Sequence, residues 1–80
     1  MSLEELKQEA FGAIHKAARI ADIRDAEVRY LGRSGKLTGV LRGLKELPEA
    51  ERKERGKEAN ALRETLEAEI AARRKELEDA

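Results

Sequence analysis

Several residue types that hold small domains together are absent or scarce in this sequence. It has no cysteine and no tryptophan, and one phenylalanine, one tyrosine and one proline among 80 residues. Without cysteine, neither disulfides nor a thiolate metal site can stabilise the chain. Because 42% of the residues are charged, a thick globular core is excluded, and the length allows one domain at most.

Long hydrophobic runs are also missing. No apolar run approaches about 18 residues, so the sequence predicts no contact with a membrane. The first ten residues, MSLEELKQEA, carry acids and no hydrophobic stretch, unlike a signal peptide. Together with the lack of cysteine, this favours a cytoplasmic location. His15 is the only histidine, and we interpret it as a surface residue without a partner at metal-ligand spacing. The carboxylates are expected on exposed helix faces, paired with basic residues. The sequence therefore predicts no metal site, no cofactor site and no catalytic residue.

What the sequence does have is helical periodicity. Alanine, glutamate, lysine, leucine and arginine dominate it, which is typical of long helices and coiled coils. In the first third, apolar residues alternate at spacings of three and four, which places them on one helix face. The stripe then resumes one step early, and this slip predicts a break or kink near residues 18–22. The apolar stripe consists of Leu3, Leu6, Ala10, Ala13, Ala17 and Ile20 before the slip, and of Ile23, Ala26 and Tyr30 after it.

The last third predicts a second long helix. Pro48 suits the first position of a helix, and the acidic residues that follow it suit the positive end of the helix dipole. Its apolar stripe, which Arg73 interrupts, consists of Ala59, Leu62, Leu66, Ile70 and Leu77. Between the two long segments, residues 36–44 predict a short helix that Gly39 and Gly43 weaken by about 1 kcal/mol each relative to alanine.

These elements predict an all-α domain over residues 1–80. We expect an antiparallel two-arm helical hairpin, or coiled coil, because each arm has one apolar stripe and no other place to bury it. The first, kinked arm covers about residues 3–31, the tip with its short helix about 32–47, and the second arm about 48–79. Gly32, Gly35 and Pro48 would form the turns, with Gly32 ending the first arm because glycine tolerates the left-handed conformation.

The charge distribution suggests where the protein would bind a partner. The chain balances 17 basic against 17 acidic residues, yet its stretch RYLGRSGKLTGVLRGLK, residues 29–45, has no acidic residue. The basic residues in this stretch are Arg29, Arg33, Lys36, Arg42 and Lys45. On a protruding tip these charges would attract phosphates. The segment GRSGK lacks the spacing of a nucleotide-binding P-loop, and Tyr30 is interpreted as a packing residue rather than a platform for base stacking.

The order of motifs resembles one known family. YLGRSGKLT, then LRGLKELPEAER, then a long helix containing AARRKELE are similar to the N-terminal region of the bacterial phenylalanyl-tRNA synthetase alpha subunit. The family pattern is Tyr-Leu-Gly, two basic residues, Gly, any residue, an aliphatic residue, and Thr or Ser, followed by a Leu-Pro-x-x-Glu-Arg element. The match covers essentially the whole chain. Ser34 departs from it, because a second basic residue is usual there.

The resemblance implies a function as well as a fold. In that family the region is a non-catalytic helical hairpin that holds the outer part of tRNA(Phe) during aminoacylation. The parent enzyme is a class II ligase of two alpha and two beta subunits that uses ATP and magnesium. The chain would then be a domain whose partners are tRNA(Phe), the rest of the alpha subunit and the beta subunit. Among the basic residues, Arg33 and Lys36 match the motif, whereas Arg29, Arg42 and Lys45 are added from charge and location.

A coiled-coil module for protein interaction or dimerisation, without RNA binding, is the alternative. Small residues at Ala10, Ala13 and Ala17 and the interruption at Arg73 predict a thin core. A homodimer of the isolated hairpin could cover such a stripe. Binding of tRNA, or its absence, distinguishes the two hypotheses.

Overall fold

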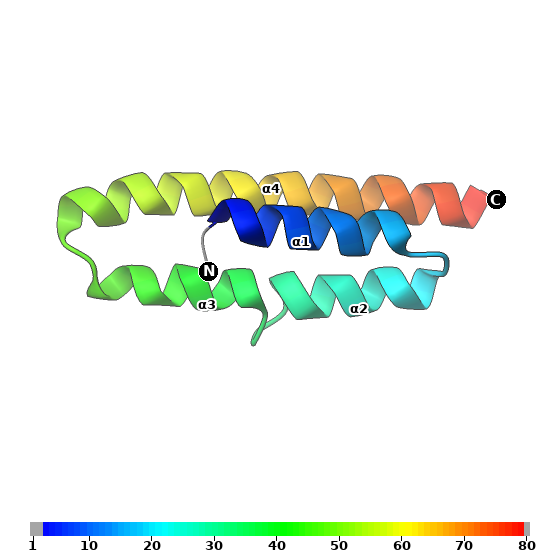
Figure 1. The fold of residues 1–80 in the computed structure, drawn as a ribbon, viewed down its shortest axis with the longest axis horizontal. Coiled ribbons are helices and arrows are strands. Elements are labelled where there is room, and N and C mark those ends of the chain that lie inside the picture. The colour runs from blue at the N-terminus through cyan, green and yellow to red at the C-terminus, as the bar shows by residue number, and fades with distance from the viewer. Residues whose placement is uncertain (1–2, 80) are drawn as a thin grey trace.

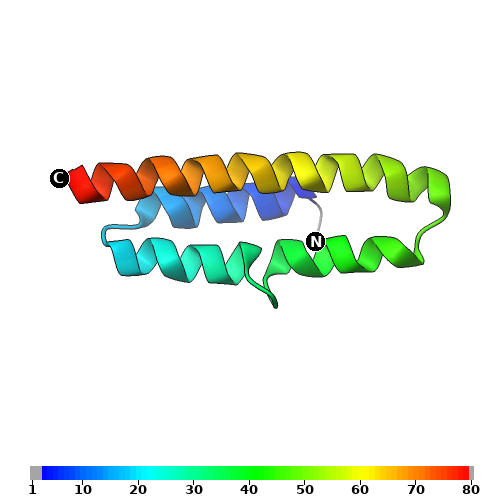
Figure 2. The same ribbon diagram turned by 180° about the vertical axis from the view of Figure 1, so that it is seen from behind.

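The computed structural model describes residues 3–79 and is all-α over that range (Figures 1 and 2). The helices are α1 (Leu3–Lys16), α2 (Ile20–Leu31), α3 (Lys36–Gly43) and α4 (Glu49–Asp79), with a single 3₁₀ turn, η1 (Leu44–Glu46), between α3 and α4. The molecule is a rod of 47 × 18 × 17 Å.

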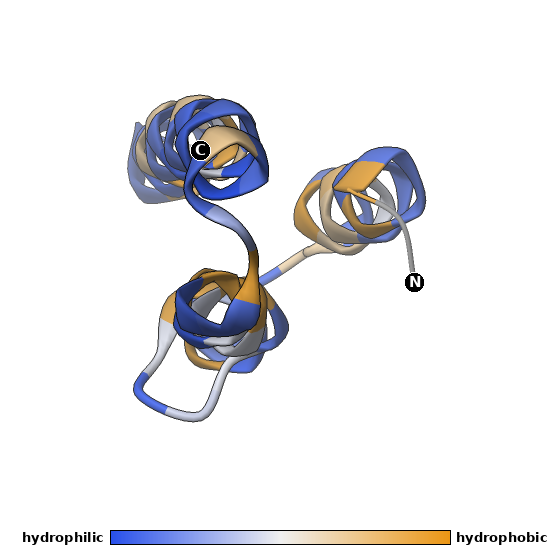
Figure 3. Cartoon of the chain, turned by 90° about the vertical axis from the view of Figure 1, so that its left-hand side faces the viewer, coloured by the Kyte–Doolittle hydropathy of each residue, from blue (hydrophilic) through white to orange (hydrophobic). Residues whose placement is uncertain are grey.

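The predicted all-α hairpin is confirmed. Helices α2 and α3 follow one another along the same side of the rod and form a single bent arm. This arm runs antiparallel to α4, and the chain turns between the two at residues 44–48, which we call the closed end. Seen along the rod, α1 lies beside both arms and makes a third member of the bundle (Figure 3).

The expected kink in the first arm is larger than predicted. Helix α1 ends at Lys16, and after residues 17–19 the chain runs back as α2, so a reversal stands where the slip in the stripe predicted a break. Two side chains hold this turn. The Asp22 carboxylate accepts hydrogen bonds from the backbone N–H groups of Ala18 and Arg19, both at 3.2 Å. The Arg73 guanidinium donates to the Ala17 carbonyl through Nη2 at 2.7 Å and Nε at 3.2 Å.

The core is one apolar seam where α1, α2, α3 and α4 meet. The predicted stripe of α4 is confirmed, with Leu77 only half-buried at its end. Two small residues, Ala10 in α1 and Ala17 directly after it, are 0% and 3% exposed. Their short side chains allow close packing against the neighbouring helices. The core members are Leu6, Ala10, Ile14, Ala17, Ile23, Ala26, Tyr30, Leu37, Ala59, Leu62, Leu66 and Ile70.

Candidate nucleic-acid interface

All the basic residues of the acid-free stretch are exposed, but they do not gather at the closed end. Arg29 lies in the last turn of α2, Lys36 begins α3, and Arg42 lies in the last turn of α3. Arg33 lies in the bend between α2 and α3, which projects from the middle of the arm, away from α1 and α4 (Figures 1 and 3). Lys45, in η1, is at the closed end. The basic residues predicted for the tip are therefore distributed along the α2–α3 arm and into η1, and we call these five residues the basic strip.

Backbone packing explains the two glycines of the bend, which spans residues 32–35. A Cβ atom on Gly32 would lie 2.5 Å from the Val28 carbonyl oxygen, and one on Gly35 would lie 2.7 Å from the Tyr30 carbonyl group. Both contacts are with backbone, so they cannot be relieved by moving a side chain. The left-handed conformation expected at Gly32 is wrong: its φ is −69° and its ψ is 174°. These positions need glycine because two backbone segments approach closely.

Thr38 and Leu37 fix the bend from the other side. The Thr38 hydroxyl donates a hydrogen bond of 2.7 Å to the Gly32 carbonyl, and the Gly35 N–H donates to the same carbonyl at 2.8 Å. Leu37 is buried in the core at 1% exposure. The residues of YLGRSGKLT therefore have different roles. The glycines form the bend, the apolar residues and the threonine pack around it, and the basic side chains between them face solvent.

A carboxylate from α1 lies against this basic strip. Glu9 Oε2 accepts a hydrogen bond of 2.7 Å from the Tyr30 hydroxyl and pairs with Lys36 Nζ at 2.6 Å. Lys36 Nζ also lies 5.9 Å from the centre of the Tyr30 ring, within the range of a cation–π contact. The Lys36 hydrogen bond, followed by the Tyr30 hydrogen bond, lowers the pKa of Glu9, which therefore stays ionised at neutral pH.

Tyr30 is a packing residue, as predicted. Its side chain is 1% exposed and closes the core beneath the bend, while its hydroxyl reaches Glu9. Burial, then the hydrogen bond to Glu9, raises the pKa of Tyr30 above its ordinary value. A raised pKa favours the neutral phenol in the folded protein. This contribution to stability is fully present below the ordinary pKa of tyrosine and is lost as the pH rises from that value through the raised pKa of the folded protein.

Sequence reasoning missed four residues that shape this surface: Glu9, Asp22, Thr38 and Arg73. Thr38 belongs to the quoted motif and Asp22 stands three residues after the helix-capping position of α2, so both had a local signal. Glu9 and Arg73 had none. Their partners lie 21 and 56 residues away along the chain. His15 is exposed, as expected, and its Nε2 lies 3.4 Å from Glu69 Oε2.

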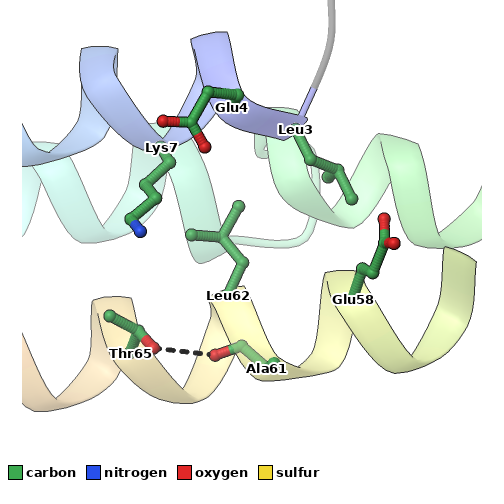
Figure 4. A pocket seen from close by; sticks show the side chains of 7 residues that line it. All are labelled: Leu3, Glu4, Lys7, Glu58, Ala61, Leu62 and Thr65. Carbon is green, nitrogen blue, oxygen red and sulfur yellow. Dashed lines mark hydrogen bonds between the residues drawn. The ribbon is translucent and has the colours of Figure 1, made fainter.

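The grooves between the helices offer little chemistry. One groove lies between α1 and α4 (Figure 4), and in it the Thr65 hydroxyl donates a hydrogen bond to the Ala61 carbonyl of its own helix at 2.9 Å. Its lining residues are Leu3, Glu4, Lys7, Glu58, Ala61, Leu62 and Thr65. Within residues 3–79, no three acidic or histidine side chains converge as metal ligands would. None of the helices described is long and apolar enough to cross a membrane.

Comparison with known proteins places the chain in a family. The family model described as "Aminoacyl tRNA synthetase class II, N-terminal domain" matches residues 18–80. The match begins in the turn between α1 and α2. No solved structure matches the chain.

Individual relatives extend the similarity over α1. The chain is 40% identical to the phenylalanine–tRNA ligase alpha subunit of Chromohalobacter salexigens over 98% of its length, and 40% identical to that of Methylibium petroleiphilum over 99%. It is 38% identical to that of Staphylococcus saprophyticus over 90%. It spans 23% of the first two relatives and 20% of the third. The chain belongs to the family of class II aminoacyl-tRNA synthetase N-terminal domains, in the form found in phenylalanine–tRNA ligase alpha subunits.

Proposed function

We propose that this domain is a non-catalytic tRNA-binding arm, and that the basic strip of the α2–α3 arm holds the outer part of tRNA(Phe) during aminoacylation. One observation carries the proposal. All five basic side chains of residues 29–45 are exposed, four on the bent arm and Lys45 at the closed end, and no acidic residue lies in that stretch. Exposed cations on a projecting surface bind phosphates and release counterions.

The proposal extends to the assembly in which the arm would act. The relatives are alpha subunits of phenylalanine–tRNA ligase. The partners are then tRNA(Phe), the remainder of an alpha subunit and a beta subunit, in the cytoplasm. ATP and magnesium would act in the catalytic part of that enzyme. This domain would bind the tRNA, and the catalytic part of the enzyme would carry out the aminoacylation.

The alternative of a dimerisation module has less support. Its motivation was an apolar stripe left uncovered by a thin core. Helix α1 folds back and covers that seam, and the large apolar side chain left exposed on the described residues is Val28, at 67%. A single exposed side chain is ordinary for a monomer and is not an interaction patch.

The first prediction tests the basic strip. In a variant with Arg33, Arg42 and Lys45 replaced by glutamine, we expect weaker binding of tRNA(Phe) and a shallower dependence of log K on log salt. Each phosphate contact removed should lower that slope by about 0.7–0.9. The loss should be similar for other tRNAs, because phosphate contacts position the partner without reading its bases. Fluorescence anisotropy of labelled tRNA at several salt concentrations measures both quantities.

A control variant removes the same charge from α4. Lys57, Arg63 and Lys75 are exposed and make no hydrogen bond or ion pair with other described residues, so their replacement by glutamine changes net charge alone. If this control weakens binding as much as the strip variant, the attraction is diffuse and the proposed surface is wrong. If the unmodified chain does not bind tRNA even at low salt, the tRNA-binding function itself is contradicted, and sedimentation of the free chain then tests dimerisation.

A further inference from the structure

The basic strip contains an anion site that the protein already fills with its own carboxylate. A single oxygen, Glu9 Oε2, accepts hydrogen bonds from the Tyr30 hydroxyl at 2.7 Å and from the Lys36 ammonium at 2.6 Å. The pKa of Glu9 is lowered mainly by its hydrogen bonds with Lys36 and Tyr30, and the charge of Arg29 makes a smaller contribution in the same direction. One hydroxyl donor and one ammonium donor on a single carboxylate oxygen are groups that would also bind a phosphate oxygen.

This site is open to solvent at the surface. The Lys36 side chain is 44% exposed and the Glu9 side chain is 38% exposed. Lys36 begins α3 directly after the projecting bend. A phosphate arriving at the bend can therefore reach the ammonium group without disturbing the core. The Tyr30 ring is buried beneath it and holds the hydroxyl in place.

We propose that Glu9 occupies a phosphate subsite of the RNA-binding surface and competes with the RNA backbone for Lys36. This inference rests on the proposed function and adds a residue from α1 that lowers the affinity of the strip. Surface ion pairs are weak, so an RNA phosphate can displace the carboxylate. Glu9 would thereby keep the affinity of the domain below the value that its five cations alone would give, which favours release of the RNA.

The second prediction concerns the variant Glu9→Gln. The amide keeps an oxygen that can accept the Tyr30 hydroxyl but loses the charge that holds Lys36. We expect tRNA(Phe) to bind about two- to fivefold more tightly, the gain set by the strength of one surface ion pair. The salt slope should become steeper by at most about 0.7–0.9, the value expected if Glu9 keeps the phosphate away from Lys36 altogether in the unmodified protein. Anisotropy titrations with the same labelled tRNA provide both readouts.

A double-mutant cycle separates the specific effect from general charge. If Glu9 acts through Lys36, the gain should vanish in a Lys36→Gln background. A gain that persists there would mean that removing any nearby negative charge suffices, and would overturn the inference. Glu67→Gln, an exposed position on α4 with the same change in charge, is the matched control and should alter neither the affinity nor the slope.

Tyr30 reports whether the variant changes the site as intended. It is the only tyrosine and there is no tryptophan, so the near-ultraviolet titration of the phenol belongs to one residue. The pKa of Tyr30 should fall in Glu9→Gln, although burial still keeps it raised. If the unmodified protein binds tRNA and this pKa falls without any gain in affinity, Glu9 is only a structural link between α1 and the bend. If the unmodified protein binds no tRNA, the proposed tRNA-binding function is contradicted, and the inference about Glu9 is contradicted with it.

Discussion

Arg73 interrupts the apolar stripe of α4 and has a specific task in the fold. Its guanidinium donates two hydrogen bonds to the Ala17 carbonyl and one, at 2.9 Å, to the Glu76 carboxylate. The Ala17 carbonyl follows the last turn of α1, where backbone acceptors lack helical partners. A positive charge is also favourable beside the negative end of that helix.

The third prediction is that Arg73→Met lowers the free energy of unfolding by about 1–2 kcal/mol, the range for losing charged hydrogen bonds at a partly exposed site. Methionine retains the apolar stem, so packing changes little. Urea unfolding followed by circular dichroism measures the loss. Lys75→Met, at an exposed position of the same helix, should change stability by less than about 0.5 kcal/mol. Equal losses in the two variants would show that the Ala17 contact contributes nothing.

For individual residues, the sequence predicted the buried apolar side chains well and the hydrogen bonds between polar side chains poorly. Leu62, Leu66 and Ile70 could be assigned from spacing, because a periodic stripe indicates which helix face is buried. Glu9 and Arg73 could not. Their partners, Tyr30 and Ala17, come near only after the chain has reversed, and no local pattern encodes a contact between separate helices.

The bend between α2 and α3 and the short helix α3 contain four glycines that act in opposite ways. At Gly32 and Gly35 an added Cβ would meet backbone atoms. At Gly39 and Gly43 it would meet nothing within 4 Å. The first two are required by close packing, whereas the other two only increase the freedom of the unfolded chain.

The fourth prediction compares two single substitutions. Gly35→Ala should destabilise the protein by about 1–3 kcal/mol, as overpacking does, because its Cβ would lie 2.7 Å from Tyr30 and 2.9 Å from the Gly32 nitrogen. Gly39→Ala should stabilise it by about 0.5–1 kcal/mol through helix propensity. Thermal melting gives the sign of each change. Two losses of similar size would mean that α3 needs flexibility at Gly39, and two gains would mean that the bend is not closely packed.

The elements themselves were largely predictable, but their directions were not. Periodicity located the helices, and the slip after Ile20 located the break in the first arm. The sequence carries no glycine or proline there to announce a reversal, so a kink was the simpler expectation. The turn is made by the hydrogen bonds of Asp22 and Arg73, and the second of these exists only in the folded protein.

Over the whole molecule, Leu66 lies at the centre of the seam and is 0% exposed. The fifth prediction is that Leu66→Ala lowers the free energy of unfolding by about 3 kcal/mol, within the range for truncating a fully buried leucine. The loss should appear as one cooperative transition, since no helix has a core of its own. Chemical denaturation followed by helical ellipticity measures it.

Val28→Ala is the matched control, because Val28 is 67% exposed. It should change stability by less than about 0.5 kcal/mol. A Leu66 variant as stable as this control would contradict the arrangement of the bundle. A transition in two steps would show instead that α1 unfolds separately from the hairpin.

The reversal that brings α1 beside α4 has a consequence for how the protein is made. During synthesis the N-terminal helices emerge first, and α1 and α2, which contact each other, can pair as soon as both are free of the ribosome. Their apolar faces stay partly bare until α4 supplies Ala59, Leu62, Leu66 and Ile70. A nascent chain that stalls before residue 59 therefore presents an uncovered seam to chaperones and proteases. The stability of α1 and α2 during synthesis therefore depends on α4, which is translated after them.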